Sequence, residues 1–253
     1  MLGWLRRRRR SRLLRRPFPP AWEEVLVGLP FVADLDPAGV LRLKKLVLVF
    51  VEDVHWEGCA GLDVTDEIRV TIAAQACRLL LGLDEEAYRH VRTILVYPST
   101  YRHDGARSGA GGVRTEGPSA RYGEAWLRGP VVLSWDASRH GVADPDDGRN
   151  TVYHEFAHKL DMLDGFADGT PPIAGRDAYE AWIRIVGREF EVLREEADRG
   201  KKSFLDAYGA TNPAEFFAVA TEVFFERPGK LRDRHADLYA CLRDFYRQDP
   251  AAV

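Results

Sequence analysis

Two histidines one helical turn apart are the residues of this chain best suited to chemistry, because residues 154–158 read His-Glu-Phe-Ala-His. On a helix, His154 and His158 project from one face, so both imidazoles can bind one Zn²⁺ ion. Glu155 lies about 100° round the helix, where its carboxylate can accept a proton from a water molecule at the metal. The pattern predicts metal-assisted hydrolysis. The alternative is a pair of surface histidines on an amphipathic helix.

The sequence around this motif predicts a helix with one apolar face. Asn150 is a good N-cap and Gly165 a good C-terminal stop, and their separation is typical of a helix. Apolar residues recur at helical spacing opposite the two histidines: Val152, Phe156, Leu160 and Leu163. We therefore expect one face to enter the core while the other presents the imidazoles to a cleft.

A catalytic zinc usually takes three protein ligands and a water molecule, so a third ligand is needed. Asp164 stands six residues after His158, where one group of zinc sites has its third ligand, but no glycine precedes it to turn the chain. The helix should therefore continue and leave Asp164 away from the metal. Asp161 shares the face of His154, where it could accept a hydrogen bond from a ligand histidine or be a solvated helix charge.

Stronger candidates for the third ligand stand in a helix that begins near Pro213, a residue suited to the first helical position, with Asn212 as its cap. Glu215 lies in the first turn, just before a run of apolar residues. Burying its carboxylate there would be costly unless it bound a cation or capped the helix. Glu222 follows seven residues later on roughly the same face. Spacing alone does not choose between Glu215 and Glu222.

The rest of the chain predicts further helices and two strands. β-branched and apolar runs indicate strands at 93–97 and 130–135. The strand at 130–135 precedes the motif helix, so it is either an exposed edge that pairs with an extended substrate or a plain internal strand. Residues 102–119 predict a mobile loop and 136–149 a polar loop. Helical patterns cover four ranges: 21–60, including a segment opened by Asp36-Pro37, 68–81, 177–199 and 231–247.

Charge is unevenly distributed along the 253 residues, whose net charge is −3. Residues 1–16 contain eight arginines and no acid; the remainder keeps 28 of the 36 basic residues against 39 acidic ones. Such a block is either a solvated, disordered tail or a segment that binds an anionic membrane, nucleic acid or an acidic partner. It is no secretory signal, because prolines at 17, 19 and 20 follow it instead of an apolar region.

Composition also bounds the cellular setting. No stretch approaches the roughly 18 apolar residues of a membrane span. The cysteines are odd in number, far apart and in no metal or redox pattern: Cys59, Cys77 and Cys241. They indicate reduced thiols and a cytoplasmic protein. The acidic balance of the body would repel phosphates, so we expect no direct binding of nucleic acid.

Two segments carry a resemblance to a known family. HEFAHKLDMLDG at 154–165 and AYGATNPAEFFAVATEVFF at 207–225 resemble the Mlc titration factor A family of zinc-dependent peptidases. The second segment also resembles the catalytic domain of anthrax lethal factor, a more distant relative. The resemblance is continuous from about residue 93 to the end and looser from 21 to 92. The arginine-rich leader departs from the family pattern.

The resemblance implies roles for particular residues. The third zinc ligand falls on Glu215, beside His154 and His158, with one Zn²⁺ per chain and Glu155 as general base. Tyr208, seven residues earlier, is implied to hydrogen-bond the oxyanion of the tetrahedral intermediate. From the residues alone, Tyr208 would be a packing aromatic near a glycine turn. Family members are associated with aminopeptidase-like cleavage, so short peptides are the implied substrates.

The expected fold class is α+β: a zincin-like metallopeptidase with a small mixed sheet packed on helices and the motif on its active-site helix. We expect residues 1–20 to form a basic, disordered tail. Residues 21–253 should form one domain, with a helical part at 21–92 and a catalytic part at 93–253.

Two other functions compete with peptide hydrolysis. The resemblance implies a link to an Mlc-type repressor of sugar-uptake genes, so the chain could act chiefly by binding such a repressor. A glutamate placed to activate water argues against a purely structural metal, since a structural site closes its fourth position with a protein ligand. The same constellation could also attack other carbonyls, as an esterase or another zinc hydrolase.

Overall fold

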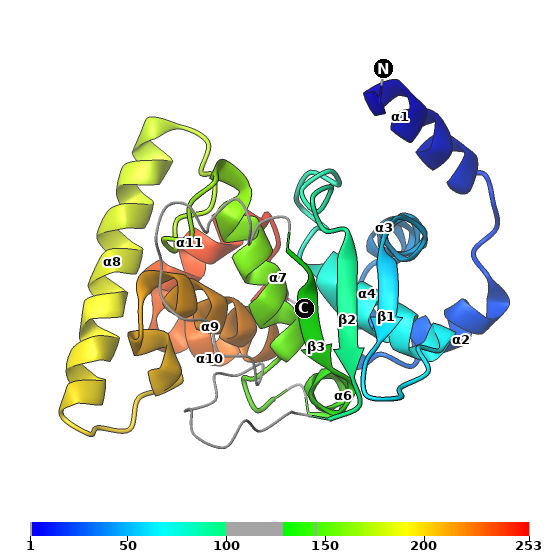
Figure 1. Cartoon of the computed structure of the whole chain (residues 1–253). Helices are drawn as coiled ribbons and strands as arrows, with labels where there is room; N and C mark the ends of the chain where they lie inside the picture. The colour runs from blue at the N-terminus through cyan, green and yellow to red at the C-terminus, as the bar shows by residue number, and fades with distance from the viewer. Residues whose placement is uncertain (1, 100–128, 145, 253) are drawn as a thin grey trace.

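The computed structural model describes residues 2–99, 129–144 and 146–252, and Figure 1 shows a small sheet with helices packed around it. The strands are β1 His55–Gly58, β2 Thr93–Tyr97 and β3 Val131–Ser134. Their order is β1-β2-β3, and both neighbouring pairs are parallel. The expectation of a mixed sheet is therefore wrong for the described residues. The chain returns from β1 to β2 through a helix, and such a crossover makes the two strands parallel.

The strands expected at 93–97 and 130–135 are confirmed as β2 and β3. Ile94 and Val96 are fully buried in the central strand, as their alternation with half-buried neighbours requires. β1 was missed because its sequence, His-Trp-Glu-Gly, has no strand pattern. Pairing with the edge of β2 makes it a strand, and this tertiary contact leaves no mark in the local sequence.

The helices carry most of the structure. They are α1 Leu2–Leu13, α2 Pro20–Val27, α3 Pro37–Asp53, α4 Asp66–Arg78, α6 Trp135–Ala143, α7 Thr151–Asp161, α8 Arg176–Asp198, α9 Pro213–Glu226, α10 Pro228–Arg234 and α11 Ala236–Tyr246. The expected starts are confirmed at Pro37, where Asp36 accepts the N–H of Gly39, and at Pro213. The single helix expected at 231–247 is two helices, α10 and α11, which meet at His235.

The polar loop expected at 136–149 is wrong over most of its length, because α6 occupies it. Ser134 caps α6 by accepting the N–H of Ala137 at 3.2 Å. Gly141 is required by the packing of α6 on the start of α7: a Cβ there would lie 2.8 Å from Nδ2 of Asn150. The glycine that indicated a loop is therefore a point of close approach between two helices.

Helix α7 lies at the centre of the molecule, in contact with β3, α4, α6 and α9 (Figure 1). Its apolar face enters one continuous core that draws on residues from Trp22 to Tyr246. There the ring of Phe156 packs against Phe50 and Tyr88, with centroids 5.6 and 4.9 Å apart. Aromatic pairs at these separations stabilise a core beyond the area they bury, so they fix α7 against the N-terminal half of the chain.

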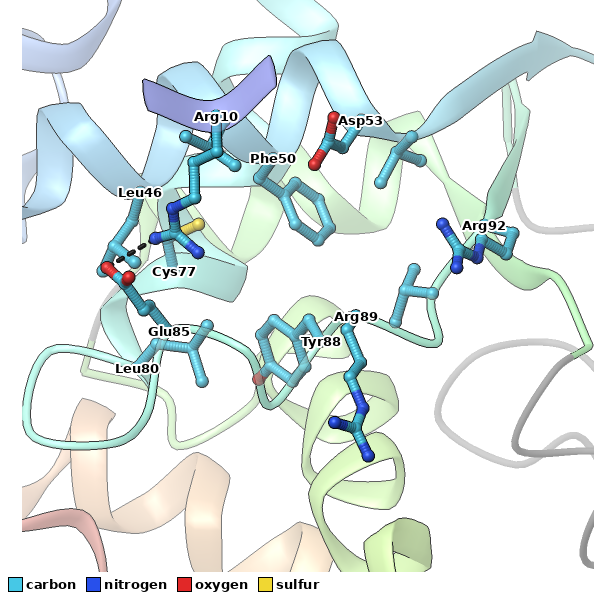
Figure 2. A pocket seen from close by; sticks show the side chains of 13 residues that line it. Arg10, Leu46, Phe50, Asp53, Cys77, Leu80, Glu85, Tyr88, Arg89 and Arg92 are labelled. Carbon is cyan, nitrogen blue, oxygen red and sulfur yellow. Dashed lines mark ion pairs between the residues drawn. The ribbon is translucent and has the colours of Figure 1, made fainter. Parts of the chain in front are cut away.

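The arginine-rich leader forms a helix, α1, instead of the expected disordered tail. Figure 2 shows Arg10 reaching from α1 to Glu85, at 2.5 Å, above a cavity of ≈ 40 Å³ whose lining includes Phe50 and Tyr88. Leu13 is only 5% exposed, and Arg9 lies 3.5 Å from Asp53. Acidic groups of the body thus neutralise arginines that would otherwise repel one another, and these contacts order the segment.

The remaining expectations concern a loop, the cysteines and membrane-spanning segments. The mobile loop predicted at 102–119 lies outside the described residues. The three cysteines are free thiols, none of them in a disulfide. Within the described parts of the chain, none of the helices combines the length and hydropathy needed to cross a membrane.

Candidate metal centre

Helix α7 presents its motif as the sequence predicts. The N-cap is Asn150, whose Oδ1 accepts the N–H of Tyr153 at 3.0 Å, and the chain leaves the helical region at Gly165 with φ 99°. Of the four residues expected on the apolar face, Val152, Phe156 and Leu160 are fully buried and Leu163 is half-buried. On the opposite side Glu155 and His158 are half-buried, so this face borders solvent.

Three ligand-type atoms converge between α7 and α9. Nε2 of His154 lies 2.9 Å from Oε2 of Glu215, and Nε2 of His158 lies 3.5 Å from the same oxygen. The two Nε2 atoms are 3.3 Å apart. All three residues offer an atom within 4.8 Å of the others, which is the geometry of a group that could hold a metal ion. The sequence-predicted ligand residues are therefore brought together.

The side chain of Glu215 is free to face the two histidines, because another residue caps the N-terminus of α9. Asn212 accepts the N–H of Glu215 at 3.0 Å and so caps α9. The capping role that the sequence also allowed for Glu215 is thus filled by Asn212, and the Glu215 carboxylate points instead at the two histidines.

Glu222 does not belong to the three converging atoms. Its Oε1 lies 2.7 Å from Nδ1 of His154, on the other side of the ring from Glu215. Its Oε2 accepts the backbone N–H of Asn150 at 2.6 Å. Glu222, the other third-ligand candidate, therefore contacts the ring nitrogen that faces away from the cluster.

Burial and charge within the cluster favour a bound cation. Burial would raise the pKa of Glu215, but hydrogen bonds with His154 and His158 hold it well below its usual range. Burial would lower the pKa of His154, whereas its bonds to Glu215 and Glu222 raise it well above the ordinary value. In the absence of metal, these two contacts therefore favour the protonated, positively charged form of His154. A metal ion on the Nε2 side would replace this positive charge, and two imidazoles with one carboxylate suit zinc.

Glu155 lies beside this cluster on α7. It is half-buried, and its negative charge contributes to raising the pKa of both His154 and Tyr208. Its carboxylate is therefore near enough to act on groups held between the two helices.

Tyr208 borders the same space from the turn Ala207–Ala210. Asp206 caps that turn by accepting the N–H of Tyr208 at 2.9 Å, and the Tyr208 ring lies 5.9 Å from the His154 ring. Burial, followed by the charge of Glu215, raises the pKa of Tyr208 above its ordinary value. The phenol therefore keeps its proton at neutral pH and can donate a hydrogen bond.

Two acids at and just beyond the C-terminal end of α7, Asp161 and Asp164, lie outside the cluster. Asp161 is fully buried and accepts the N–H of Gly169 at 3.0 Å, so it is neither a solvated charge nor bonded to a ligand histidine. Burial raises its pKa to about 7. Asp164 is exposed and accepts the N–H of Phe166, consistent with the expectation that it stays away from the metal.

Sequence reasoning missed two partners of α7. Neither the contact of Glu222 with His154 nor that of Glu226 with Asn150, at 3.1 Å, was predicted. The signal was present: Glu215, Glu222 and Glu226 are spaced by seven and four residues, which places them on one face of a helix. Three acids on one face of an otherwise apolar helix need partners on the element opposite.

Comparison with known proteins places this chain. A family model described as glucose-regulated metallo-peptidase M90 matches residues 4–247. The chain belongs to this family. Membership means a metallopeptidase that uses a metal ion. Between α7 and α9, the side chains of His154, His158 and Glu215 are grouped so that they could hold one.

Three relatives of this M90 peptidase are similar over most of their length. An uncharacterized protein of Synechocystis sp. is 39% identical over 244 residues, which cover 96% of this chain and 89% of its own. Mlc titration factor A of Serratia proteamaculans is 34% identical over 236 residues, 91% of this chain and 88% of its own. The protein of that name from Yersinia pestis is 32% identical over 236 residues, 91% and 85%. The resemblance to the Mlc titration factor A family is confirmed.

The M90 match also corrects one interpretation of the leader. It begins at residue 4, so it includes the arginine-rich segment, which was expected to depart from the family pattern. That segment is helix α1, which packs on α3. It is therefore part of what the family model describes.

Proposed function

We propose that this protein is a zinc-dependent peptidase that cleaves short peptides, in the manner of an aminopeptidase. The observation that carries the proposal is the convergence of His154 Nε2, His158 Nε2 and Glu215 Oε2 within 4.8 Å, in a member of a metallopeptidase family. These three side chains would hold the zinc, one ion per chain. Bound zinc would polarise the substrate carbonyl and lower the pKa of water at the site.

Glu155 would move the proton in this reaction. Its half-buried carboxylate lies on the motif face of α7, next to His154. It would accept a proton from the attacking water and then deliver it to the leaving amine, so that one group serves as base and acid.

Tyr208 would stabilise the charge that develops on the carbonyl oxygen. Its raised pKa keeps the phenol protonated, and its ring lies beside that of His154. A donor already held in place costs no reorganisation when the oxyanion forms.

The sheet supports a peptide as substrate. Of the described strands, β3 stands at the end of the sheet next to α7 (Figure 1). An extended peptide could add to such a strand through backbone hydrogen bonds and so present its carbonyl to the metal. This arrangement supports the edge-strand interpretation over a plain internal strand.

The variant Glu155→Gln tests the proposal. Removing the base should lower turnover of short peptides by about 10²–10⁴-fold while zinc binding is kept, because Glu155 is not a ligand. Turnover and zinc content are measured on the same preparation. Full activity in the variant, or in metal-free wild type, would contradict the mechanism.

A second candidate function is titration of an Mlc-type repressor, favoured by relatives named Mlc titration factor A that cover most of this chain. Such a partner would place the protein in the cytoplasm. Glu155→Gln separates the two functions: a repressor-binding protein should still bind and titrate its repressor when peptide cleavage has stopped. Loss of both would make the binding depend on the peptidase.

A further inference from the structure

We infer that Glu222 is a positioning residue of the metal centre: one of its carboxylate oxygens orients the His154 ring, and the other holds the N-terminus of α7. The inference rests on the proposed function, because it concerns the same histidine. It goes beyond that function in assigning a role to a residue that need not touch metal, water or substrate.

The contacts of Glu222 leave little freedom to the side chain. Oε1 lies 2.7 Å from Nδ1 of His154, and Oε2 accepts the N–H of Asn150 at 2.6 Å. Glu222 is only 3% exposed. A buried carboxylate is costly unless its oxygens are hydrogen-bonded, and here both are.

The chemistry of the ring makes the first contact directional. To bind a cation through Nε2, neutral His154 must carry its proton on Nδ1. That N–H needs an acceptor, and Oε1 of Glu222 stands where the acceptor must be. The backbone N–H of Asn150 donates to the other oxygen, Oε2, which leaves Oε1 to face the ring. The pair therefore sets the tautomer that turns the Nε2 lone pair toward Glu215 and His158.

The second contact couples this orientation to the position of α7. Asn150 caps the helix through its Oδ1, and its backbone N–H is held by Glu222. Glu215 and Glu222 belong to one helix, α9, so the ligand oxygen and the positioning oxygens move together. In the metal-free protein, two glutamates of α9 contact the His154 ring: Glu222 at Nδ1 and Glu215 at Nε2.

Matched glutamine variants of α9 test this role. Glu222→Gln keeps size and shape, but its amide cannot accept from both His154 Nδ1–H and Asn150 N–H. One contact is lost, and we expect the dissociation constant for zinc to rise about 10–100-fold. Glu226→Gln is the control: Glu226 is buried on the same face and bonds Asn150 Nδ2, but does not contact His154. Its zinc affinity should be that of wild type.

Zinc affinity is measured by competition with a chromogenic chelator, and thermal unfolding of each metal-free variant checks its fold. The inference is overturned if Glu222→Gln binds zinc as tightly as wild type, or if both variants weaken binding equally. Failure of wild type to bind zinc would instead contradict the proposed function, so the two failures are distinguishable.

A second measurement does not depend on the folding of a variant. In zinc-loaded wild type, ¹⁵N NMR of the imidazoles should show a proton on Nδ1 of His154 that exchanges slowly with water, because it is bonded to a buried carboxylate. An unprotonated Nδ1, or a proton that exchanges as in an exposed ring, would contradict the assignment.

Discussion

The two histidines of the motif come from the same helix, one turn apart, yet their surroundings differ. The His154 side chain is 3% exposed, and each of its ring nitrogens contacts a glutamate of α9. The His158 side chain is 16% exposed; its Nε2 faces Glu215 at 3.5 Å, and its Nδ1 has no hydrogen-bond partner among the described residues. Helix α7 therefore supplies two candidate ligands: His154, which protein contacts hold in place, and His158, which they hold less firmly.

A metal centre on a pair of helices can thus combine a ligand fixed by protein contacts with a ligand that the metal itself would fix. In the metal-free protein His154 joins α7 to α9 through both ring nitrogens, and its Nδ1 contact with Glu222 can remain when a metal ion occupies the Nε2 side. We expect His158 to depend on the metal for its second firm contact. The two residues should thus contribute alike to metal binding but unequally to the stability of the metal-free protein.

The largest expected effect is on the stability of the metal-free protein when either histidine is replaced by alanine. In metal-free protein, His154→Ala should lower the free energy of unfolding by about 3–5 kcal/mol, because it removes the histidine partner of buried Glu222 and leaves Glu215 with His158 alone. His158→Ala should cost about 1 kcal/mol, since that ring is more exposed and less bonded. Urea unfolding of both variants measures the difference, and equal losses would show that the two rings are equally anchored.

A smaller effect concerns Tyr208, which lies against the anchored ring. Tyr208→Phe keeps the ring but removes the donor, so kcat should fall by about 10²-fold while the dissociation constant for zinc stays the same. Steady-state kinetics and chelator competition separate the two quantities. A fall in zinc affinity with unchanged kcat would mean that the tyrosine supports the His154 ring instead of the oxyanion.

A further effect is a pH dependence of stability in the metal-free protein, which arises at Glu226 beside the N-cap of α7. Burial raises the pKa of Glu226 to about 9, against the lowering effects of Asn150 and Arg78. Between pH 4.5 and about 9 the folded protein keeps a proton that the unfolded chain has lost, so this group's contribution to stability falls as pH rises. Glu226→Gln should remove that fall.

Unfolding of metal-free wild type and Glu226→Gln is compared at pH 5 and pH 8, within the window that this pKa sets. The variant should gain stability relative to wild type at the higher pH. A difference that does not change with pH would mean that Glu226 is ionised throughout in the folded protein.

Much of this centre could be predicted from local sequence. The caps Asn150 and Asn212, the proline start of α9 and the spacing of the motif are short-range signals, and each is found in place. They act within a turn or two of helix, so a single sequence displays them. Placing Glu215 at His154 required more, because residues 61 apart in the sequence meet only through the packing of α7 on α9.

What escaped prediction depends on such packing. The spacing of Glu222 and Glu226 shows that they share a face of α9, but it does not show which residues of α7 lie opposite that face. Strand β1 exists because β2 lies beside it, and α6 forms where Gly141 lets it approach Asn150. The arginines of α1 become ordered through acids of the body such as Glu85, which no local pattern connects to them.

The most direct test of the account is a crystal structure of the zinc-loaded protein with anomalous data at the zinc edge. The account predicts one zinc, bound by Nε2 of His154, Nε2 of His158 and the carboxylate of Glu215, with Glu222 on the far nitrogen of His154 and no fourth protein ligand. A zinc bound by Glu222 in place of Glu215, or one whose last position is filled by another side chain, would contradict it.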